Sequence, residues 1–346
     1  DVRRERGCLQ LAPLDLCATM VSPSEVLKKQ SLDGQRKKKT HAIVGVEADS
    51  FCKDALELMV SHHILALPVI DSGVYHTPGG TYGTVQGKRV IGVIDMLDIV
   101  ALMCKLHVST SGMPPAYRYS HEWVEWNDAK VEQAVHEKKR SPEVISHHGS
   151  LADAARVMIN NNVHRVLVCD DEHRLVDVVT QSDLVDALHA AIPSLDQTYL
   201  CRAISQFEVV QRDQEILSAD CSTKAIEVFR LMDHNYVSAI PVIDFDRNRQ
   251  LVGNISARDI RDVIREDDFP RSLYTEDALS FAQKMHTRRG PSVPPLNVSL
   301  KPTNTLGDVI ETLNAFKIHR VWIVNAQGQV THVLSLGDVL QEIMDH

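Results

Sequence analysis

Several features that define other protein classes are missing from this sequence. No run of about 18 apolar residues occurs among its 346 residues, so it predicts no membrane-spanning helix. Its seven cysteines are scattered and never form a C-x-x-C pair, which disfavours a disulfide framework or zinc site and indicates reduced thiols in a cytoplasmic compartment. Lysine and arginine number 37 against 46 acidic residues, and this net charge of −9 argues against sequence-independent nucleic-acid binding.

Catalytic and metal-binding patterns are also scarce. No Ser-His-Asp or Cys-His order stands out, so we expect a protein that is not an enzyme. The Gly-rich stretch 79–88 does not fit a phosphate-binding Walker loop, which needs Gly at the position of Tyr82 and Ser or Thr at the position of Arg89. We predict a mobile hairpin loop instead. The adjacent residues His147 and His148 should point apart on a strand or helix, so we expect no metal site.

What the sequence does contain is a fourfold repeat. Four strand-like segments rich in β-branched residues, each ending in Asp or Asn, occupy residues 64–71, 163–170, 237–244 and 318–325. Each follows a helical pattern, for which Ser150 and Thr305 are N-caps in the second and fourth copies, and each precedes a second strand and a short helix. The helix-opening carboxylate recurs after 85, 76 and 79 residues, at Asp98, Asp183, Asp259 and Asp338. The pattern predicts an α+β fold built from helix–strand–strand–helix repeats.

These spacings divide the chain into segments. We assign an N-terminal extension or linker (1–40), repeat one (41–106, with an insertion at 72–89), a connector (107–130) and repeats two, three and four (131–191, 192–266 and 267–346). The basic run 28–39 in the extension is interpreted as a solvated linker, a nuclear address or a contact for an acidic partner. Because the first residue is Asp1 rather than Met, we expect a fragment or processed form, and one hypothesis is the regulatory part of a larger protein.

A hydroxyl residue stands three positions before the recurring carboxylate in three of the repeats. The pairs are Thr180 with Asp183, Ser256 with Asp259, and Ser335 with Asp338. A helix N-terminus attracts anions, a hydroxyl can donate to a phosphate or ribose oxygen, and a carboxylate can accept from vicinal ribose hydroxyls. A single copy would be read as a helix cap worth about 1 kcal/mol. The recurrence favours a ligand, although Asp95 at the first repeat's hydroxyl position would repel a phosphate.

Two of the strand-like segments contain a His-Arg pair directly after their first residue. These pairs are His164-Arg165 and His319-Arg320. Arginine is rarely buried without a partner, and the same pair in two repeats indicates a shared anionic ligand, for which a guanidinium suits a phosphate. The alternative is an ion pair with a carboxylate of the protein itself. A phosphate-bearing adenosine ligand would engage the basic pair and the ribose carboxylate together.

These motifs closely resemble cystathionine-β-synthase-type (CBS) domains, four in tandem, and among them the gamma regulatory subunits of AMP-activated protein kinase. The last repeat matches best, through Ile318-His-Arg-Val and Val333-Leu-Ser-Leu-Gly-Asp-Val-Leu-Gln341. Val237-Ser-Ala-Ile-Pro-Val in the third repeat is also gamma-like, and Leu251-Val-Gly-Asn-Ile-Ser-Ala-Arg-Asp-Ile260 is similar to plant-type gamma-like proteins. The resemblance covers about 300 residues.

The resemblance implies two stacked Bateman modules in a flat disc, with AMP, ADP or ATP bound near its centre as regulatory ligands. Adenine would lie in an apolar cleft. The ribose would contact Asp338, Asp183, Asp259 and Asp98, and the phosphates would contact Ser335, Thr180, Ser256, His319, Arg320, His164 and Arg165. The implied function is that of a non-catalytic energy sensor, assembled with catalytic (alpha) and scaffold (beta) kinase subunits and with neither nucleic acid nor membrane.

Two departures from the family pattern affect which repeats we expect to bind. Gamma subunits carry further phosphate-binding arginines where this chain has Leu65 and Tyr236, and they typically lack one of the four ribose carboxylates that are all present here. We therefore rank the fourth and second repeats above the third, and the first last. An alternative function is a stand-alone, homodimeric tandem-CBS regulator that binds AMP, ATP or S-adenosylmethionine and controls another enzyme or a transporter.

Overall fold

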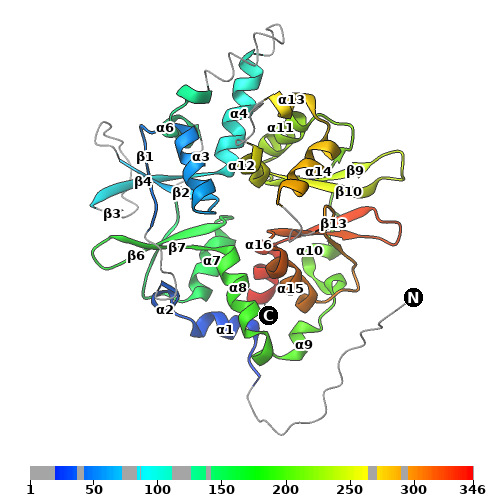
Figure 1. Ribbon diagram of the computed structural model, residues 1–346. Helices are drawn as coiled ribbons and strands as arrows, with labels where there is room; N and C mark the ends of the chain where they lie inside the picture. The colour runs from blue at the N-terminus through cyan, green and yellow to red at the C-terminus, as the bar shows by residue number, and fades with distance from the viewer. Residues whose placement is uncertain are drawn as a thin grey trace.

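The computed structural model describes residues 20–36, 43–71, 84–85, 87–110, 126–137, 142–263, 271–289 and 295–345. Within these ranges four small sheets each combine two longer antiparallel strands with a short strand that runs parallel to the first of them. Helices flank every sheet (Figure 1). This arrangement confirms the α+β fold of four helix–strand–strand–helix repeats.

Repeats one and two follow the same order of elements. Repeat one contains β1 (Val46–Glu47), α3 (Cys52–Ser61), β2 (Ala66–Ile70), β3 (Thr84–Val85), β4 (Lys88–Asp95) and α4 (Met96–Thr110). Repeat two contains β5 (Val144–Ser146), α7 (Leu151–Asn160), β6 (Arg165–Cys169), β7 (Leu175–Thr180) and α8 (Gln181–Ala191). At the end of the insertion in repeat one, Thr84 and Val85 pair antiparallel with Arg89 and Lys88, whereas 72–83 and 86 lie outside the described residues.

Repeats three and four have the same order. Repeat three contains β8 (Ala219–Asp220), α11 (Ala225–Asn235), β9 (Ala239–Asp244), β10 (Gln250–Ser256), the 3-10 helix η3 (Ala257–Asp259) and α12 (Ile260–Val263). Repeat four contains β11 (Ser299–Leu300), α15 (Leu306–Phe316), β12 (Arg320–Val324), β13 (Val330–Ser335) and α16 (Leu336–Met344). The predicted caps are confirmed, because Ser150 and Thr305 each form a capping box with the Asp three residues later.

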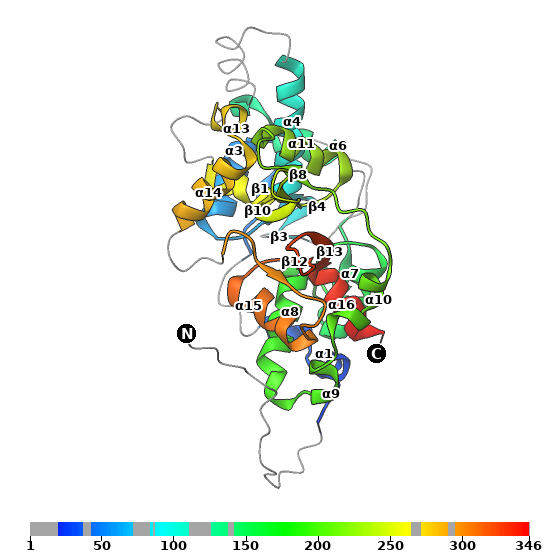
Figure 2. The ribbon, with the colours of Figure 1, turned by 90° about the vertical axis from the view of Figure 1, so that its right-hand side faces the viewer.

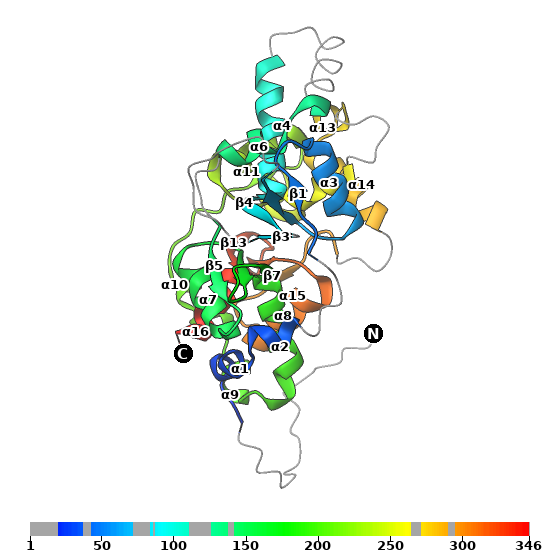
Figure 3. The same ribbon diagram turned by 90° about the vertical axis from the view of Figure 1, so that its left-hand side faces the viewer.

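Two kinds of contact join the repeats into one body. Helices pack repeat one on repeat three, chiefly α4 on α11, and repeat two on repeat four, chiefly α8 on α15 and α7 on α16. Sheet faces pack repeat one on two, through residues such as Val90 and Leu167, and repeat three on four, through Leu251 and Trp322. In Figure 1 repeats one and three form the upper half and repeats two and four the lower half, around a common centre. The body is narrower when turned by 90° (Figures 2 and 3), in agreement with a flattened disc.

The segment that leads into each repeat covers the neighbouring repeat. Helix α6 (Val131–Glu137), which precedes repeat two, packs in the core of repeats one and three. Four short helices precede repeat three and pack with repeats two and four: η1 (Ile192–Ser194), α9 (Gln197–Leu200), η2 (Ile204–Gln206) and α10 (Glu208–Gln211). Helices α13 (Arg271–Thr275) and α14 (Ala278–Arg289) precede repeat four and pack with repeat three. Spacing along the chain does not reveal this exchange between neighbours.

The same exchange corrects the interpretation of the N-terminal segment. We expected a linker at 28–39, yet α1 (Pro23–Lys29) and α2 (Leu32–Arg36) bury Leu27 and Leu32 in the core of repeats two and four. Apolar residues on these helices drive the packing, and the lysines lie in the last turn of α1. Residues 37–39 lie outside the described residues.

Isolated backbone bridges fix all four leading segments in the same way. Each bridge joins a leading segment to the residue that caps the first helix of the neighbouring repeat: Ser31 to Ser150, Lys130 to Phe51, Ala203 to Thr305, and Asp277 to Lys224. The fourfold recurrence shows that this exchange is a property of the repeat itself.

The described cysteines form no disulfides with one another. Five of them are free thiols: Cys52, Cys104, Cys169, Cys201 and Cys221. Burial raises the pKa of Cys52 and Cys104 to about 12, which keeps both thiols protonated. Among the described helices, none is both long enough and apolar enough to span a membrane.

The cap of α15 provides a test of the repeat architecture. Thr305→Ala removes the oxygen that accepts from the Asp308 backbone N–H at 3.2 Å, and we expect it to lower the free energy of unfolding by about 1 kcal/mol. Thr305→Ser keeps that oxygen and should unfold at nearly the wild-type urea concentration. Equal losses in the two variants would show that the cap oxygen does not stabilise the helix.

Candidate ligand-binding site at the centre of the four repeats

Strand register places the predicted basic and hydroxyl residues side by side. In repeat two the register pairs Arg165 with Thr180, and in repeat four it pairs Arg320 with Ser335. The equivalent pairs in repeats one and three are Ala66 with Asp95 and Ala239 with Ser256. Repeats two and four therefore each present an arginine beside a helix-capping hydroxyl, and the other two repeats do not.

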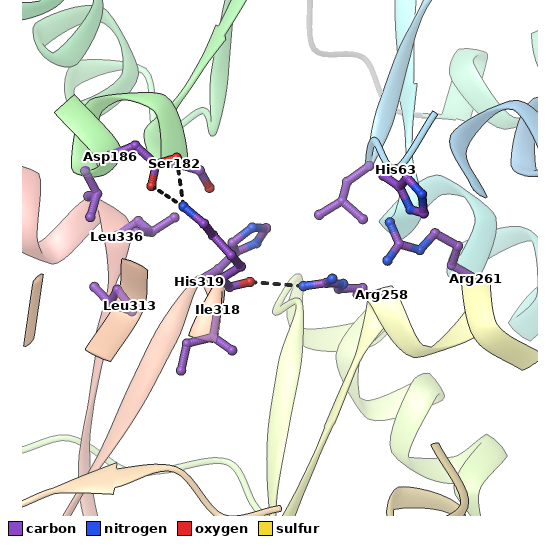
Figure 4. A pocket seen from close by; sticks show the side chains of 12 residues that line it. His63, Ser182, Asp186, Arg258, Arg261, Leu313, Ile318, His319 and Leu336 are labelled. Carbon is purple, nitrogen blue, oxygen red and sulfur yellow. Dashed lines mark hydrogen bonds and ion pairs between the residues drawn. The ribbon is translucent and has the colours of Figure 1, made fainter. Parts of the chain in front are cut away.

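These strand ends meet around a cavity of about 990 Å³ that all four repeats line. Nine of the eleven residues predicted to contact a ligand are among its lining residues: Asp183, Asp259, Thr180, Ser256, Ser335, His164, Arg165, His319 and Arg320. The volume is at the upper end of the range of small-molecule pockets. A recess of about 310 Å³ adjoins it, where Arg258 and Arg261 approach from repeat three, His63 from repeat one and His319 from repeat four (Figure 4).

The two remaining carboxylates serve as helix caps. The carboxylate of Asp338 accepts hydrogen bonds from the backbone N–H of Ser335 at 2.7 Å and from its hydroxyl at 2.6 Å. Asp98 is buried and accepts from the backbone N–H of Asp95 at 2.7 Å. Neither lines the cavity, and their roles toward a ribose stay predictions. Thr180 and Asp183 form the same cap, at 2.7 Å between hydroxyl and carboxylate, but on the cavity wall.

Positive charge is concentrated at the centre. Burial and four neighbouring basic side chains lower the pKa of His319 to about 3, the neighbours being Arg320, Arg258, His164 and Arg165. Burial is the larger cause of the shift, and the like charges of these neighbours add to it. The same cavity is also lined by the carboxylates of Asp95, Asp177, Asp183 and Asp259, so basic and acidic groups share it.

Arg320 is buried at this centre with a hydroxyl partner from another repeat. Its guanidinium donates to the hydroxyl of Ser238 in repeat three. Burial lowers the pKa of Arg320 to about 10, and the nearby carboxylate of Asp338 opposes the shift. The side chain still carries its charge at pH 7.

Arg165 has an acidic neighbour instead. Its guanidinium lies 3.7 Å from the carboxylate of Asp95 in repeat one, and both side chains are mostly buried, with 18% and 25% of their surfaces exposed. The pair corresponds to the alternative interpretation of an internal ion pair. A phosphate at Arg165 would have to compete with this carboxylate.

The third repeat departs further from the predicted pattern. The carboxylate of Asp259 accepts from the backbone N–H of Ser256 at 2.6 Å through one oxygen, and its other oxygen pairs with Arg289. Arg289 also donates to Asp262 at 2.6 Å. A ribose at Asp259 would have to displace a charged partner, which supports ranking this repeat below the second and fourth.

Sequence reasoning missed three residues that shape the cavity: Arg258, Arg289 and Ser238. Arg258 donates to the backbone carbonyl of Lys317 at 3.0 Å and links repeats three and four (Figure 4). Only the third copy has arginine directly before its recurring carboxylate, and this difference was the one available signal for Arg258. Arg289 reaches Asp259 from the exchanged helix α14, which sequence spacing assigns to repeat four.

The low pKa of His319 predicts a pH dependence of stability. As pH falls from about 6.5 toward 3, the unfolded chain binds a proton at this position that the folded chain does not, so protonation favours unfolding. We expect the wild type to lose more stability between pH 7 and pH 5 than His319→Gln, as measured by urea unfolding. His173→Asn, in an exposed turn, should follow the wild type. Parallel curves for the wild type and His319→Gln would contradict the assignment.

Comparison with known proteins agrees with this architecture. Residues 135–190, 208–266 and 293–345 match the family model of the CBS domain. An Arabidopsis thaliana protein named SNF1-related protein kinase regulatory subunit gamma-1-like is 30% identical over 130 residues, covering 36% of this chain and 28% of that protein. Another from Arabidopsis thaliana, named SNF1-related protein kinase regulatory subunit gamma-like PV42b, is 23% identical over 350 residues, covering 86% and 90%.

In four curated relatives, the first of these two Arabidopsis thaliana proteins among them, the aligned segment covers only 28% to 47% of the relative's own length. Among solved structures, a Methanocaldococcus jannaschii protein described as a candidate archaeal homologue of the AMPK gamma subunit superposes with a TM-score of 0.63. It is 17% identical, and the match covers 93% of this chain and 99% of that one, which establishes the shared fold. The chain is therefore a tandem CBS-domain protein that resembles the gamma regulatory subunit of AMP-activated protein kinase.

Proposed function

We propose that this protein is a regulatory sensor that binds AMP, ADP or ATP in its central cavity. The observation that carries the proposal is the group of basic side chains facing a cavity lined by all four repeats, with the pKa of His319 lowered to about 3. An anionic ligand offsets the repulsion among these groups, and a phosphate accepts from several guanidinium donors at once.

The proposed contacts differ among the repeats. In repeat four, Arg320, His319 and Ser335 would contact phosphate oxygens. In repeat two, Arg165 and Thr180 would do so, with the ribose at Asp183. The capping bonds engage one oxygen of Asp183, and a carboxylate has about four lone-pair positions, so the cap and a ribose hydroxyl are compatible.

The position of the ligand, at the meeting point of the four repeats, would give it a regulatory role. A phosphate held between repeats contacts residues on separate cores, so its binding free energy depends on how the repeats are arranged. A nucleotide changes a partner's activity only through a difference in its affinity for two arrangements.

We propose kinase catalytic and scaffold subunits as the partners. Support comes from the names of the two Arabidopsis thaliana relatives, which are regulatory subunits of a kinase. Co-purification of tagged full chain with a kinase subunit would support this assignment. Recovery of a lone symmetric dimer would instead favour the stand-alone regulator.

Calorimetric titration tests the ligand. We expect the purified full chain to bind AMP or ATP with micromolar affinity and Arg320→Gln to weaken AMP at least tenfold, since a charged hydrogen bond contributes about 1.5–3 kcal/mol. Adenosine, which lacks the phosphate, should bind the variant and the wild type similarly. Arg156→Gln, which removes an exposed charge paired with Asp153, is the matched control and should bind AMP as the wild type does.

Each other outcome of that titration has a definite meaning. Equal losses for AMP and adenosine would remove Arg320 from the phosphate site. Binding of S-adenosylmethionine without AMP or ATP would replace the nucleotide sensor with a regulator that responds to a different adenosyl ligand. Binding of none of these ligands would overturn the proposed function.

The ion pair between Asp95 and Arg165 yields a second prediction, in which a substitution strengthens AMP binding. Asp95→Asn removes the competing charge. The backbone N–H of Leu97 donates a hydrogen bond to the side chain of Asp95 at 2.9 Å, and the amide oxygen of asparagine can accept the same bond. We expect AMP affinity to rise about fivefold, the equivalent of about 1 kcal/mol. Unchanged or weaker AMP binding in the same calorimetric assay would show that Arg165 does not contact the phosphate.

A further inference from the structure

Two turns at one edge of the second repeat bring three potential metal ligands together, away from the central cavity. Strand β5 runs parallel to β6, with Ser146 opposite Cys169, so both strands end at the same edge of the sheet. His147 and His148 follow β5 directly, and Asp171 follows β6 two residues after its end. The arrangement depends on strand pairing and not on proximity in sequence.

The geometry of these three side chains corrects our expectation for the histidine pair. We expected adjacent histidines to point apart, but His147 and His148 lie in a turn beyond the strand, and their ring centroids are 3.9 Å apart. Nε2 of His148 lies 3.2 Å from both carboxylate oxygens of Asp171, and Nε2 of His147 lies 3.7 Å from Oδ1. Strict alternation of side chains applies within a strand, and it fails in a turn.

His147 adds an independent observation. Both ring nitrogens of His147 are buried, and among the described residues neither has a hydrogen-bond partner. A buried polar nitrogen without a partner is costly, and such groups are rare in native proteins. By contrast, His148 and Asp171 are about two-thirds exposed, so an ion has access to the group from solvent.

Of the three consecutive carboxylates in this turn, Asp170 and Glu172 pair with Arg174, and Asp171 faces the histidines. Asp170 accepts from Arg174 at 2.8 Å, and Glu172 also pairs with Arg174. Asp171 instead faces the two histidines, and an aspartate carboxylate is ordinarily ionised at neutral pH. Two imidazoles and one ionised carboxylate form a donor set that suits borderline divalent metals and not Mg²⁺.

We propose that His147, His148 and Asp171 bind one Zn²⁺ ion, with water completing a tetrahedral shell. At metal–ligand distances of about 2.0–2.2 Å, neighbouring ligand atoms in a tetrahedron lie about 3.4 Å apart. The carboxylate of Asp171 lies 3.2 Å from Nε2 of His148 and 3.7 Å from Nε2 of His147, and one ligand atom from each of the three residues lies within 4.8 Å of the others. The site would fasten the end of β5, only three residues long, to β6. It would also hold the turn whose Gly149 carbonyl accepts from the backbone N–H of Leu32 at 3.0 Å, which anchors α2.

The test is calorimetric titration of ZnCl₂ into metal-free, tag-free full chain. We expect one tight binding event that His148→Ala and Asp171→Asn each weaken at least tenfold, since each removes one of three protein ligands. His173→Asn is the matched control, because His173 is an exposed histidine nearby with a left-handed backbone that Asn tolerates. MgCl₂ should produce no comparable binding in the wild type.

A second measurement keeps the proposal falsifiable if a variant loses structure. Co²⁺ bound tetrahedrally by the wild type should give visible absorption that Zn²⁺ abolishes, and circular dichroism should confirm that each variant is folded. Zn²⁺ affinity unchanged in both folded variants, or no tight Zn²⁺ binding to the wild type, would overturn the site. AMP binding is a separate readout, so failure here leaves the proposed nucleotide function unaffected.

Discussion

The repulsion among basic side chains at the meeting point of the four repeats is the constraint on which the rest of the structure depends. His319 is held neutral by its surroundings, while Arg320 keeps its charge and donates to a hydroxyl of another repeat. Asp95 and Asp338 neutralise part of this charge from opposite halves of the body. Under the proposed function, a phosphate would accept hydrogen bonds from the arginines that share this centre.

The four repeats divide this task unequally. Repeats two and four combine an arginine with a capping hydroxyl in register, whereas repeats one and three have alanine at the equivalent position. Repeat one contributes a carboxylate that occupies Arg165, and repeat three contributes Ser238 and Arg258. Divergence of equivalent positions has therefore produced two proposed phosphate contacts and two supporting repeats from one architecture.

Local patterns in the sequence were sufficient to predict the repeats, the helix caps of Ser150 and Thr305, and nine of the residues that line the cavity. These features depend on residues a few positions apart, such as Thr305 with Asp308, or on one motif repeated along the chain. Contacts between distant segments could not be predicted this way. The pairing of Arg289 with Asp259 requires the position of α14, and the approach of His147 and His148 to Asp171 requires the pairing of β5 with β6.

The exchanged leading segments make each repeat depend on its neighbour for a covered core. A single repeat cut out at its sequence boundaries would leave behind the helix that covers its own core and carry away one that belongs to its neighbour, as α6 and α14 show. A consecutive pair keeps both exchanged segments, whereas the helix faces that pack repeat one on three and repeat two on four require both pairs. Loss of a single repeat would therefore expose apolar surface both on the repeat that its leading segment covers and on the repeat that shares its core.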